Sequence, residues 1–184
     1  MLKSLSQIKK WIQKEHVLDV IQFGSSQRGK TRPNDIDLCI LVSDIDEKKS
    51  LDLIHSLSKI TDKEEYKVQI NIITSSSFAS GNSLVKTLFE EGGSIKHNKK
   101  FSEVFGFQNK SFFVYSLKHF SSSQRVKFHY MLQGRYGTEG VLKEVNGKFV
   151  GTGTIIIPTE KEDILKEIFD QWAVKYTIER ILES

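Results

Sequence analysis

The segment from Phe23 to Leu41 constrains the fold of this chain more than any other part of its 184 residues. It reads FGSSQRGKTRPNDIDLCIL, so one short apolar run ends at Gly24-Ser25 and a second one begins around Asp35 and Asp37. Two residues that are two positions apart on a strand project from the same face. The segment therefore predicts two strands joined by a polar turn, with a pair of carboxylates beside that turn.

The spacing of apolar residues predicts further helices and strands around this segment. We expect an amphipathic helix over residues 2–15, strands at Val17–Phe23 and Ile36–Val42, a helix at Glu47–Ile60, a strand at Tyr66–Ile73 and a helix at Leu84–Glu91. Side chains alternate along a strand, so Lys67, Gln69 and Asn71 are expected to share one face of the third strand. Gly92-Gly93 is expected to end the last of these helices in the left-handed conformation. These elements predict an α/β (α+β) fold in which helices flank a small mixed β-sheet.

The residues after position 97 predict a second small α+β unit. We expect a strand at Lys110–Leu117, a helix at Ser122–Gln133, a two-stranded ribbon of Val141–Val145 and Lys148–Ile157 joined at Asn146-Gly147, a helix at Glu160–Trp172 and a strand at Val174–Leu182. Ser121 with Gln124, and Thr159 with Glu162, have the spacing of capping boxes at the starts of the two helices. Gly134 is expected to end the helix at Ser122–Gln133. The alternative for this segment is a strand over Arg125–Leu132. The expected domains are residues 1–97 and residues 98–184.

Composition limits the class of protein. Apolar residues make up 38% of the chain and charged residues 27%, which is typical of globular domains. No apolar run approaches the roughly 18 residues of a membrane span, and the N-terminal segment lacks the apolar core of a signal peptide. We therefore expect a cytoplasmic protein without a membrane partner. The single cysteine, Cys39, excludes a disulfide framework and a cysteine metal cluster.

The run F-G-S-x-x-R-G-x-x-x-x-x-D-I-D-L, from Phe23 to Leu38, resembles the signature of the DNA polymerase beta nucleotidyltransferase superfamily, especially its minimal nucleotidyltransferases. The resemblance covers about residues 1–97. It implies that Gly24 and Ser25 hold the triphosphate of a nucleotide, with Arg28 either meeting phosphate or bracing the turn. Glycine lets the backbone approach phosphates closely, and a helix N-terminus presents free N–H donors to them.

The same resemblance implies that Asp35 and Asp37 hold Mg²⁺ ions that bridge the triphosphate. Carboxylate oxygens are hard ligands, and they suit a magnesium ion that also keeps water and phosphate oxygens. Transfer of a nucleotidyl group needs charge neutralisation and in-line positioning more than covalent chemistry. A nucleoside triphosphate such as ATP and the cofactor Mg²⁺ are therefore the expected ligands.

The third strand departs from the family pattern. A third aspartate on that strand completes the metal site in the family, and alignment places Asn71 at this position. An amide oxygen can ligate a metal, but it is a far poorer base and adds no negative charge. Gln69 is also neutral, while Asp62, Glu64 and Glu65 precede the strand and would need a shift of register to substitute.

Two classes of function remain open at this point. The first is an enzyme that transfers a nucleoside monophosphate from the triphosphate to an acceptor hydroxyl of RNA, protein or a small molecule. Asp35 and Asp37 would hold metal, and Asn71 would act as a weak ligand in its catalytic site. The second is a catalytically impaired binding protein with this fold, which acts on RNA or a protein partner, for example in an antitoxin-like role. Of the two, we favour transfer.

The segment Lys96–Val150 suggests a further partner. It contains ten basic and three acidic residues, a local charge of +7, interleaved with many aromatic residues. Lysines and arginines can contact phosphates while exposed rings stack on bases. Aromatic residues at this spacing also form ordinary cores, and the charge alone is typical of many solvated surfaces. The candidate nucleic-acid contacts are Lys118, Arg125, Lys127 and Arg135.

Overall fold

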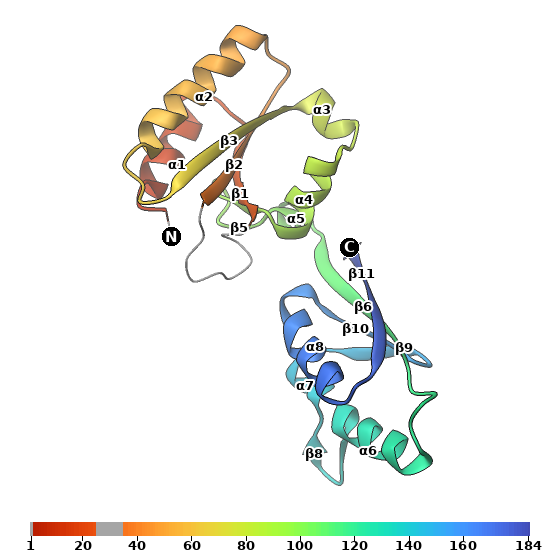
Figure 1. Cartoon of the computed structure of the whole chain (residues 1–184). Helices are drawn as coiled ribbons and strands as arrows, with labels where there is room; N and C mark the ends of the chain where they lie inside the picture. Colours follow the sequence, from red (N-terminus) through yellow and green to blue (C-terminus); the bar gives the residue numbers. More distant parts are fainter. Residues whose placement is uncertain (1, 25–34) are drawn as a thin grey trace. The chain divides into compact units, whose positions relative to one another are not determined.

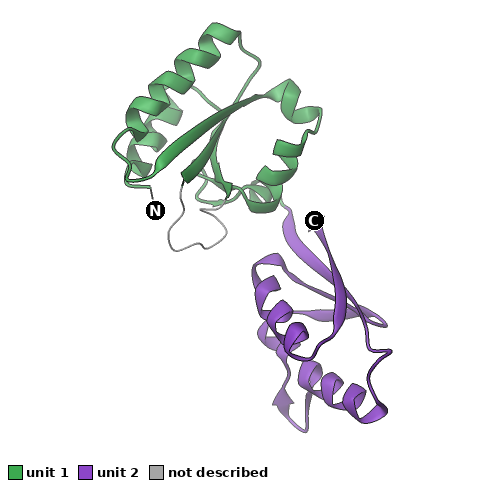
Figure 2. Ribbon diagram, viewed as in Figure 1, with its two compact units in different colours: residues 1–106 green, residues 107–184 purple. Residues whose placement is uncertain are grey.

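A computed structural model of the chain describes residues 2–24 and 35–184. The chain divides into two compact units, residues 1–106 and residues 107–184 (Figure 2). The division lies beyond the expected boundary at 97/98, because residues 93–104 complete the first unit. There, β4 (Gly93–Ser94) and β5 (Lys99–Lys100) extend its sheet, and α5 (Phe101–Val104) adds Phe101 to its core.

The first unit is built on a five-stranded mixed sheet with the strand order β3-β2-β1-β4-β5. Its long strands are β1 (Asp19–Phe23), β2 (Asp35–Val42) and β3 (Lys67–Thr74). β2 and β3 are parallel, whereas β1 is antiparallel to both β2 and β4. The predicted mixed sheet flanked by helices is confirmed.

Helices cover both faces of this sheet (Figure 1). On one face, α1 (Leu5–Lys14) and α2 (Glu47–Thr61) bury Trp11 and Leu57 against alternate residues of β2 such as Leu38. On the other face, α4 (Ser83–Glu91) and α5 pack on the intervening residues of β1 and β2, among them Cys39. The short helix α3 (Ser75–Ala79) follows directly on β3. Because both faces are covered, the end of β2 is almost continuously apolar.

The expected left-handed closure at Gly92 is wrong. Gly92 has an extended backbone, with φ −73° and ψ 142°. A Cβ atom at this position would lie 2.3 Å from the Leu88 carbonyl oxygen and 2.7 Å from Cγ2 of Ile21. Glycine is therefore required here because the Leu88 carbonyl group of α4 and the Ile21 side chain of β1 leave no room for a side chain, and not because of a left-handed backbone.

The second unit contains a four-stranded antiparallel sheet with the order β11-β6-β10-β9. Its elements are β6 (Gln108–Ser116), α6 (Ser122–Gln133), the hairpin strands β7 (Gly134–Arg135) and β8 (Thr138–Glu139), α7 (Val141–Glu144), β9 (Lys148–Gly151), β10 (Thr154–Pro158), η2 (Thr159–Lys161), α8 (Glu162–Gln171) and β11 (Lys175–Glu183). Without the small hairpin and α7, the chain path is β-α-β-β-α-β, the ferredoxin-like arrangement. The core lies between the sheet and the helices, and it contains Phe113, Phe128 and Phe169.

Local signals in this unit had mixed outcomes. The helix α6 begins and ends where the sequence predicts, with a complete Ser121–Gln124 capping box, so the alternative strand is excluded. The ribbon turning at Asn146-Gly147 is wrong, because residues 141–144 are helical and β9 turns into β10 after Gly151. The capping box of Thr159 with Glu162 is also absent, since Glu162 binds other side chains.

In the described residues, no helix has the length and apolar character that crossing a membrane requires.

Candidate functional site

The two predicted aspartates lie together at the start of β2. Asp35 and Asp37 are half-buried, whereas every residue from Leu38 to Val42 is buried. They lie on the face that carries Cys39 further along the strand, where α4 and α5 cover the sheet. The aspartate pair therefore occupies the end of this face at which the apolar covering stops, next to the connection from β1.

Gly24 approaches Asp37 closely. Phe23 is the antiparallel partner of Asp37, and Gly24 follows it with a φ of +77°. A Cβ atom at position 24 would lie 2.1 Å from Oδ2 of Asp37. The backbone angle favours glycine, and a side chain at position 24 would have to displace the Asp37 carboxylate. The structure thus brings together the predicted turn glycine and one of the predicted metal ligands.

The neighbouring strand contributes Gln69 to this group. In the parallel pairing of β2 with β3, Asp37 is the partner of Gln69, whereas Asn71 is the partner of Cys39. Gln69 Nε2 donates a hydrogen bond of 2.9 Å to Oδ2 of Asp35. Asn71 is exposed on the same face, two residues further along the strand. Gln69 is therefore the β3 residue in contact with the aspartate pair. The alternation of side chains predicts only that Gln69 and Asn71 share a face, and not which of them contacts the aspartates.

The acidic residues that precede β3 are engaged elsewhere. Glu64 accepts hydrogen bonds from the backbone N–H groups of Lys3 and Ser4, at 3.1 and 2.7 Å. Burial opposes ionisation of Glu64, but these hydrogen bonds and one from the Ser4 hydroxyl outweigh it and lower its pKa. Glu65 forms an ion pair with Lys3. Within residues 2–24 and 35–184, no set of three His, Cys, Asp or Glu side chains is arranged to hold a metal ion.

Two predicted nucleotide-binding residues, Ser25 and Arg28, lie outside the described residues. They belong to the connection between β1 and β2 that starts after Gly24 and ends before Asp35. Their roles stay predictions. Cys39 lies beside the site in sequence, but burial raises the pKa of its thiol to about 12. Its thiolate form is therefore suppressed, and Cys39 belongs to the core.

The sequence of residues 6–100 matches the family described as "Polymerase beta, Nucleotidyltransferase". This match spans the whole five-stranded sheet and both aspartates. The chain belongs to the polymerase beta nucleotidyltransferase family. Its nucleotidyltransferase domain carries Asp35 and Asp37 at the start of β2, beside Gly24. No curated protein matches the chain in a search by sequence.

Several solved structures are similar to this nucleotidyltransferase chain. One is a toxin–antitoxin with AMP-PNP, which is 20% identical, covers 50% of this chain and 71% of its own, and has a TM-score of 0.37. Another is a tri-AMPylated HEPN toxin of Shewanella oneidensis in complex with MNT antitoxin, which is 20% identical, covers 50% of this chain and 68% of its own, and has a TM-score of 0.35. At this level of similarity, neither structure identifies substrates or partners of the present chain.

The four candidate nucleic-acid contacts all lie in the second unit, and all four are exposed. Arg125 donates hydrogen bonds to the carbonyl oxygens of Leu117 and Lys118, at 3.2 and 3.4 Å, so part of its guanidinium braces the connection before α6. Lys127 lies on α6, and Arg135 lies on β7. α6 and the hairpin that follows it thus present three of the four cations.

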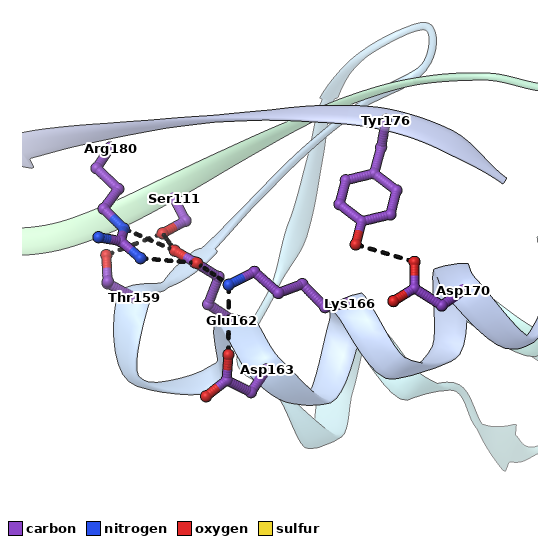
Figure 3. A network of polar contacts seen from close by, with 8 residues as sticks. All are labelled: Ser111, Thr159, Glu162, Asp163, Lys166, Asp170, Tyr176 and Arg180. Carbon is purple, nitrogen blue, oxygen red and sulfur yellow. Dashed lines mark hydrogen bonds and ion pairs between the residues drawn. The ribbon is translucent and has the colours of Figure 1, made fainter. Parts of the chain in front are cut away.

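A separate cluster of charges surrounds Glu162 at the start of α8 (Figure 3). Glu162 is buried and accepts two hydrogen bonds of 2.9 Å from Arg180 and one of 2.8 Å from Ser111. Lys166 lies 2.5 Å from the same carboxylate. Burial alone would raise the pKa of Glu162, but the hydrogen bonds from Arg180, Lys166 and Ser111 lower it to about 2. The cluster joins α8 to β6 and β11, so we interpret it as structural.

Proposed function

We propose that the nucleotidyltransferase domain transfers a nucleoside monophosphate from a nucleoside triphosphate to an acceptor hydroxyl and releases pyrophosphate, with Mg²⁺ held by Asp35 and Asp37. The close approach of Gly24 to Oδ2 of Asp37 is the observation that carries the proposal. It puts a carboxylate directly against the glycine that starts the expected phosphate-binding turn. Ser25 and Arg28 would then contact the triphosphate from within the connection.

The donor set fits magnesium together with a nucleotide. Two carboxylates on one strand face supply hard oxygen ligands, and magnesium in nucleotide sites is commonly bound by one or two carboxylates plus phosphate oxygens. When bound, the ion would neutralise charge on the transferring phosphoryl group. The hydrogen bond from Gln69 to Asp35 would hold that carboxylate in place and leave its second oxygen available as a ligand.

Gln69 would also limit the reaction. Its amide orients Asp35 but cannot accept a proton from an acceptor hydroxyl at neutral pH. Catalysis would then depend on positioning of the acceptor and on neutralisation of charge. Asn71 stays a candidate weak ligand on the same face. We therefore expect transfer to be slow compared with a site that has three carboxylates.

One observation favours a second function, that of a binding protein with impaired catalysis. The residue in contact with the aspartate pair on β3 is an amide, and the described residues contain no set of three acidic ligands there. Such a protein would still bind a nucleoside triphosphate and magnesium at the aspartates. It would act through RNA or a protein partner, as an antitoxin does, and not through transfer.

Labelling with an α-labelled nucleoside triphosphate separates these functions. Purified protein is incubated with total cellular RNA and protein, with and without magnesium, and labelled acceptors are counted. We expect magnesium-dependent label that is lost in Asp35→Asn/Asp37→Asn. The charge-matched variant Asp52→Asn/Asp62→Asn should keep the label, because these exposed side chains lie on and after α2, which packs on the opposite face. Label that persists without the aspartate pair would contradict the site, and absence of label with retained nucleotide binding would favour the binding protein.

A further inference from the structure

The second unit has an exposed surface that combines cations with aromatic rings and has no part in the proposed transfer site. It is formed by Lys127 and Tyr130 of α6 and by Arg135 and Tyr136 of the following hairpin, and we call it the α6–hairpin surface. Lys127 and Tyr130 are three residues apart on a helix and are therefore neighbours on its outer side. All four side chains are exposed.

Two tyrosines enclose one arginine on this surface. Cζ of Arg135 lies 4.6 Å from the ring centroid of Tyr130 and 4.5 Å from that of Tyr136. The Tyr136 side chain is 90% exposed, although a large aromatic side chain normally gains stability by burial. The stack fixes the orientation of Arg135 and leaves one face of the Tyr136 ring to solvent. An exposed ring that contacts a neighbouring arginine on one face is suited to stack on another flat group.

The hairpin holds Tyr136 at its tip by local constraints. Tyr136 has a φ of +48° and the next residue, Gly137, has a φ of +84°. The hydroxyl of Thr138 donates to the carbonyl oxygen of Arg135 at 2.5 Å and accepts from its backbone N–H at 3.2 Å. A Cβ atom at Gly140 would meet backbone atoms at 2.3 Å, so the base of the hairpin packs tightly on the end of α6. A two-residue hairpin turn of this type has positive φ at both central positions, so the turn itself holds Tyr136 at the tip.

A cavity of about 350 Å³ adjoins this surface. It lies between β6 and α6 and is lined by Tyr115, Leu117, Arg125, Val126, Phe128, His129 and Tyr130. Tyr130 therefore contributes both to the cavity and to the stack on Arg135. The volume lies at the lower end of the roughly 300–1,000 Å³ typical of small-ligand pockets, which suits a group as small as one nucleobase.

The charge around these rings is positive. Residues 117–139 contain the cations Lys118, Arg125, Lys127 and Arg135 but a single acidic residue, Glu139. Glu139 forms an ion pair with Lys143, so its charge is compensated. A partner complementary to this surface is therefore an anion that also carries flat aromatic rings.

We propose that the α6–hairpin surface binds single-stranded nucleic acid. A base stacks on the free face of Tyr136, a neighbouring base enters the cavity beside Tyr130, and Lys127 and Arg135 contact the phosphates. A single strand fits because its bases can leave the stack and lie on aromatic rings, which bases inside a duplex cannot do. This surface is independent of Asp35 and Asp37, so it would bind without magnesium or nucleoside triphosphate.

Fluorescence anisotropy with the full chain tests the proposal. The probes are labelled RNA and DNA oligonucleotides of about 16 nucleotides, single-stranded or duplex, because single-strand binding sites reach about this length. We expect tighter binding of single strands than of duplexes. Tyr136→Ala should weaken binding about tenfold, while Tyr136→Phe, which keeps the ring and loses only the hydroxyl that accepts a hydrogen bond from Arg135, should weaken it much less. The RNA and DNA probes show which of the two sugars the surface accepts.

Two charge-matched double variants distinguish binding at this surface from nonspecific electrostatic attraction of nucleic acid to the basic unit. Lys127→Ala/Arg135→Ala should weaken binding and reduce the dependence of log affinity on log salt by about 1.4, the value for two lost contacts to a single strand. Lys148→Ala/Lys175→Ala removes two exposed lysines of the four-stranded sheet and should change the affinity little. Equal losses in both variants, tighter duplex binding or no binding by the native chain would overturn the proposal. Self-association that Tyr136→Ala abolishes, without nucleic-acid binding, would instead assign the surface to a second copy of the chain.

Discussion

Gly24 lies so close to Asp37 that a Cβ atom at position 24 would meet Oδ2 of that carboxylate at 2.1 Å. We expect Gly24→Ala to weaken binding of a nucleoside triphosphate with magnesium at least tenfold, because the new Cβ would displace the Asp37 carboxylate. The backbone strain alone should lower the free energy of unfolding by about 1–2 kcal/mol. Titration calorimetry and chemical denaturation measure the two effects.

Gly81 offers a matched control for this change. It also has a positive φ, of +68°, but a Cβ atom there would meet nothing within 4 Å. Gly81→Ala should therefore lower the free energy of unfolding through backbone strain but leave the affinity for nucleotide unchanged. If both variants bound nucleotide as the native protein does, the contact between Gly24 and Asp37 would have no part in the site.

The register of β3 leads to a prediction about catalysis. Gln69 pairs with Asp37 and Asn71 pairs with Cys39, so a carboxylate at position 69 lies nearer the aspartate pair. We expect Gln69→Asp to increase label transfer from an α-labelled triphosphate by about tenfold or more, since a positioned base typically contributes 10²–10⁴-fold. Asn71→Asp should increase it less. A larger gain from Asn71→Asp would show that the acceptor reaches the site from further along the strand.

The sequence predicts which residues of the site share a strand face, but not which residues of neighbouring strands are in contact. Two-residue spacing was enough to place Asp35 with Asp37, and to place Gln69 and Asn71 on one face. Alternation does not give the register between parallel strands, which depends on how the connecting helix packs. For this reason the hydrogen bond between Gln69 and Asp35 could not be predicted from the sequence and is known only from the structure.

At the scale of elements, the charge cluster of Glu162 determines how α8 attaches to its sheet (Figure 3). Glu162→Gln should lower the free energy of unfolding by about 2 kcal/mol at neutral pH, because Arg180 loses its buried partner. The cost stays below that of a fully buried pair, since the side chains of Arg180 and Lys166 are 47% and 33% exposed. Glu167→Gln, on the exposed side of the same helix, is the control and should change stability little.

The effect of Glu162 should depend on pH in a definite direction. Its pKa falls from an ordinary value of 4.5 to about 2 in the folded state. A carboxyl with a lowered folded pKa stabilises the protein above its unfolded pKa and loses this contribution as the pH falls through its folded pKa. The stability difference between native protein and Glu162→Gln should therefore be constant above pH 5 and shrink toward pH 2. Denaturant titrations across this range would contradict the assignment if the difference did not change.

The same cluster explains why one local signal failed. Thr159 and Glu162 have capping-box spacing, but ion pairs with Arg180 and Lys166 recruit the carboxylate, and α8 starts after a short 3-10 turn. Asn146-Gly147 follows the one-turn helix α7, where Asn146 takes a φ of +52°. By contrast, the Ser121–Gln124 box forms as expected, with both of its reciprocal hydrogen bonds. A distant charge thus overrode the local pattern at Thr159 and Glu162, and a short helix overrode the one at Asn146-Gly147.

At the scale of the whole molecule, the two units have separate cores. The apolar clusters of residues 1–106 and of residues 107–184 share no residue. We therefore expect two transitions in scanning calorimetry. Glu162→Gln should lower one of them, and nucleoside triphosphate with magnesium, at about 100 times its Kd, should stabilise the other by about 2.7 kcal/mol. A single transition that responds to both changes would contradict independent units.

We expect Asp35 and Asp37, beside Gly24, to bind a nucleoside triphosphate through magnesium. Titration calorimetry of the native chain, of Asp35→Asn/Asp37→Asn and of the charge-matched Asp52→Asn/Asp62→Asn tests this expectation most directly, with magnesium and with a chelator. Magnesium-dependent binding is expected in the native chain and in Asp52→Asn/Asp62→Asn, and its loss is expected in Asp35→Asn/Asp37→Asn. Unchanged magnesium-dependent affinity in the protein that lacks the aspartate pair would contradict this expectation.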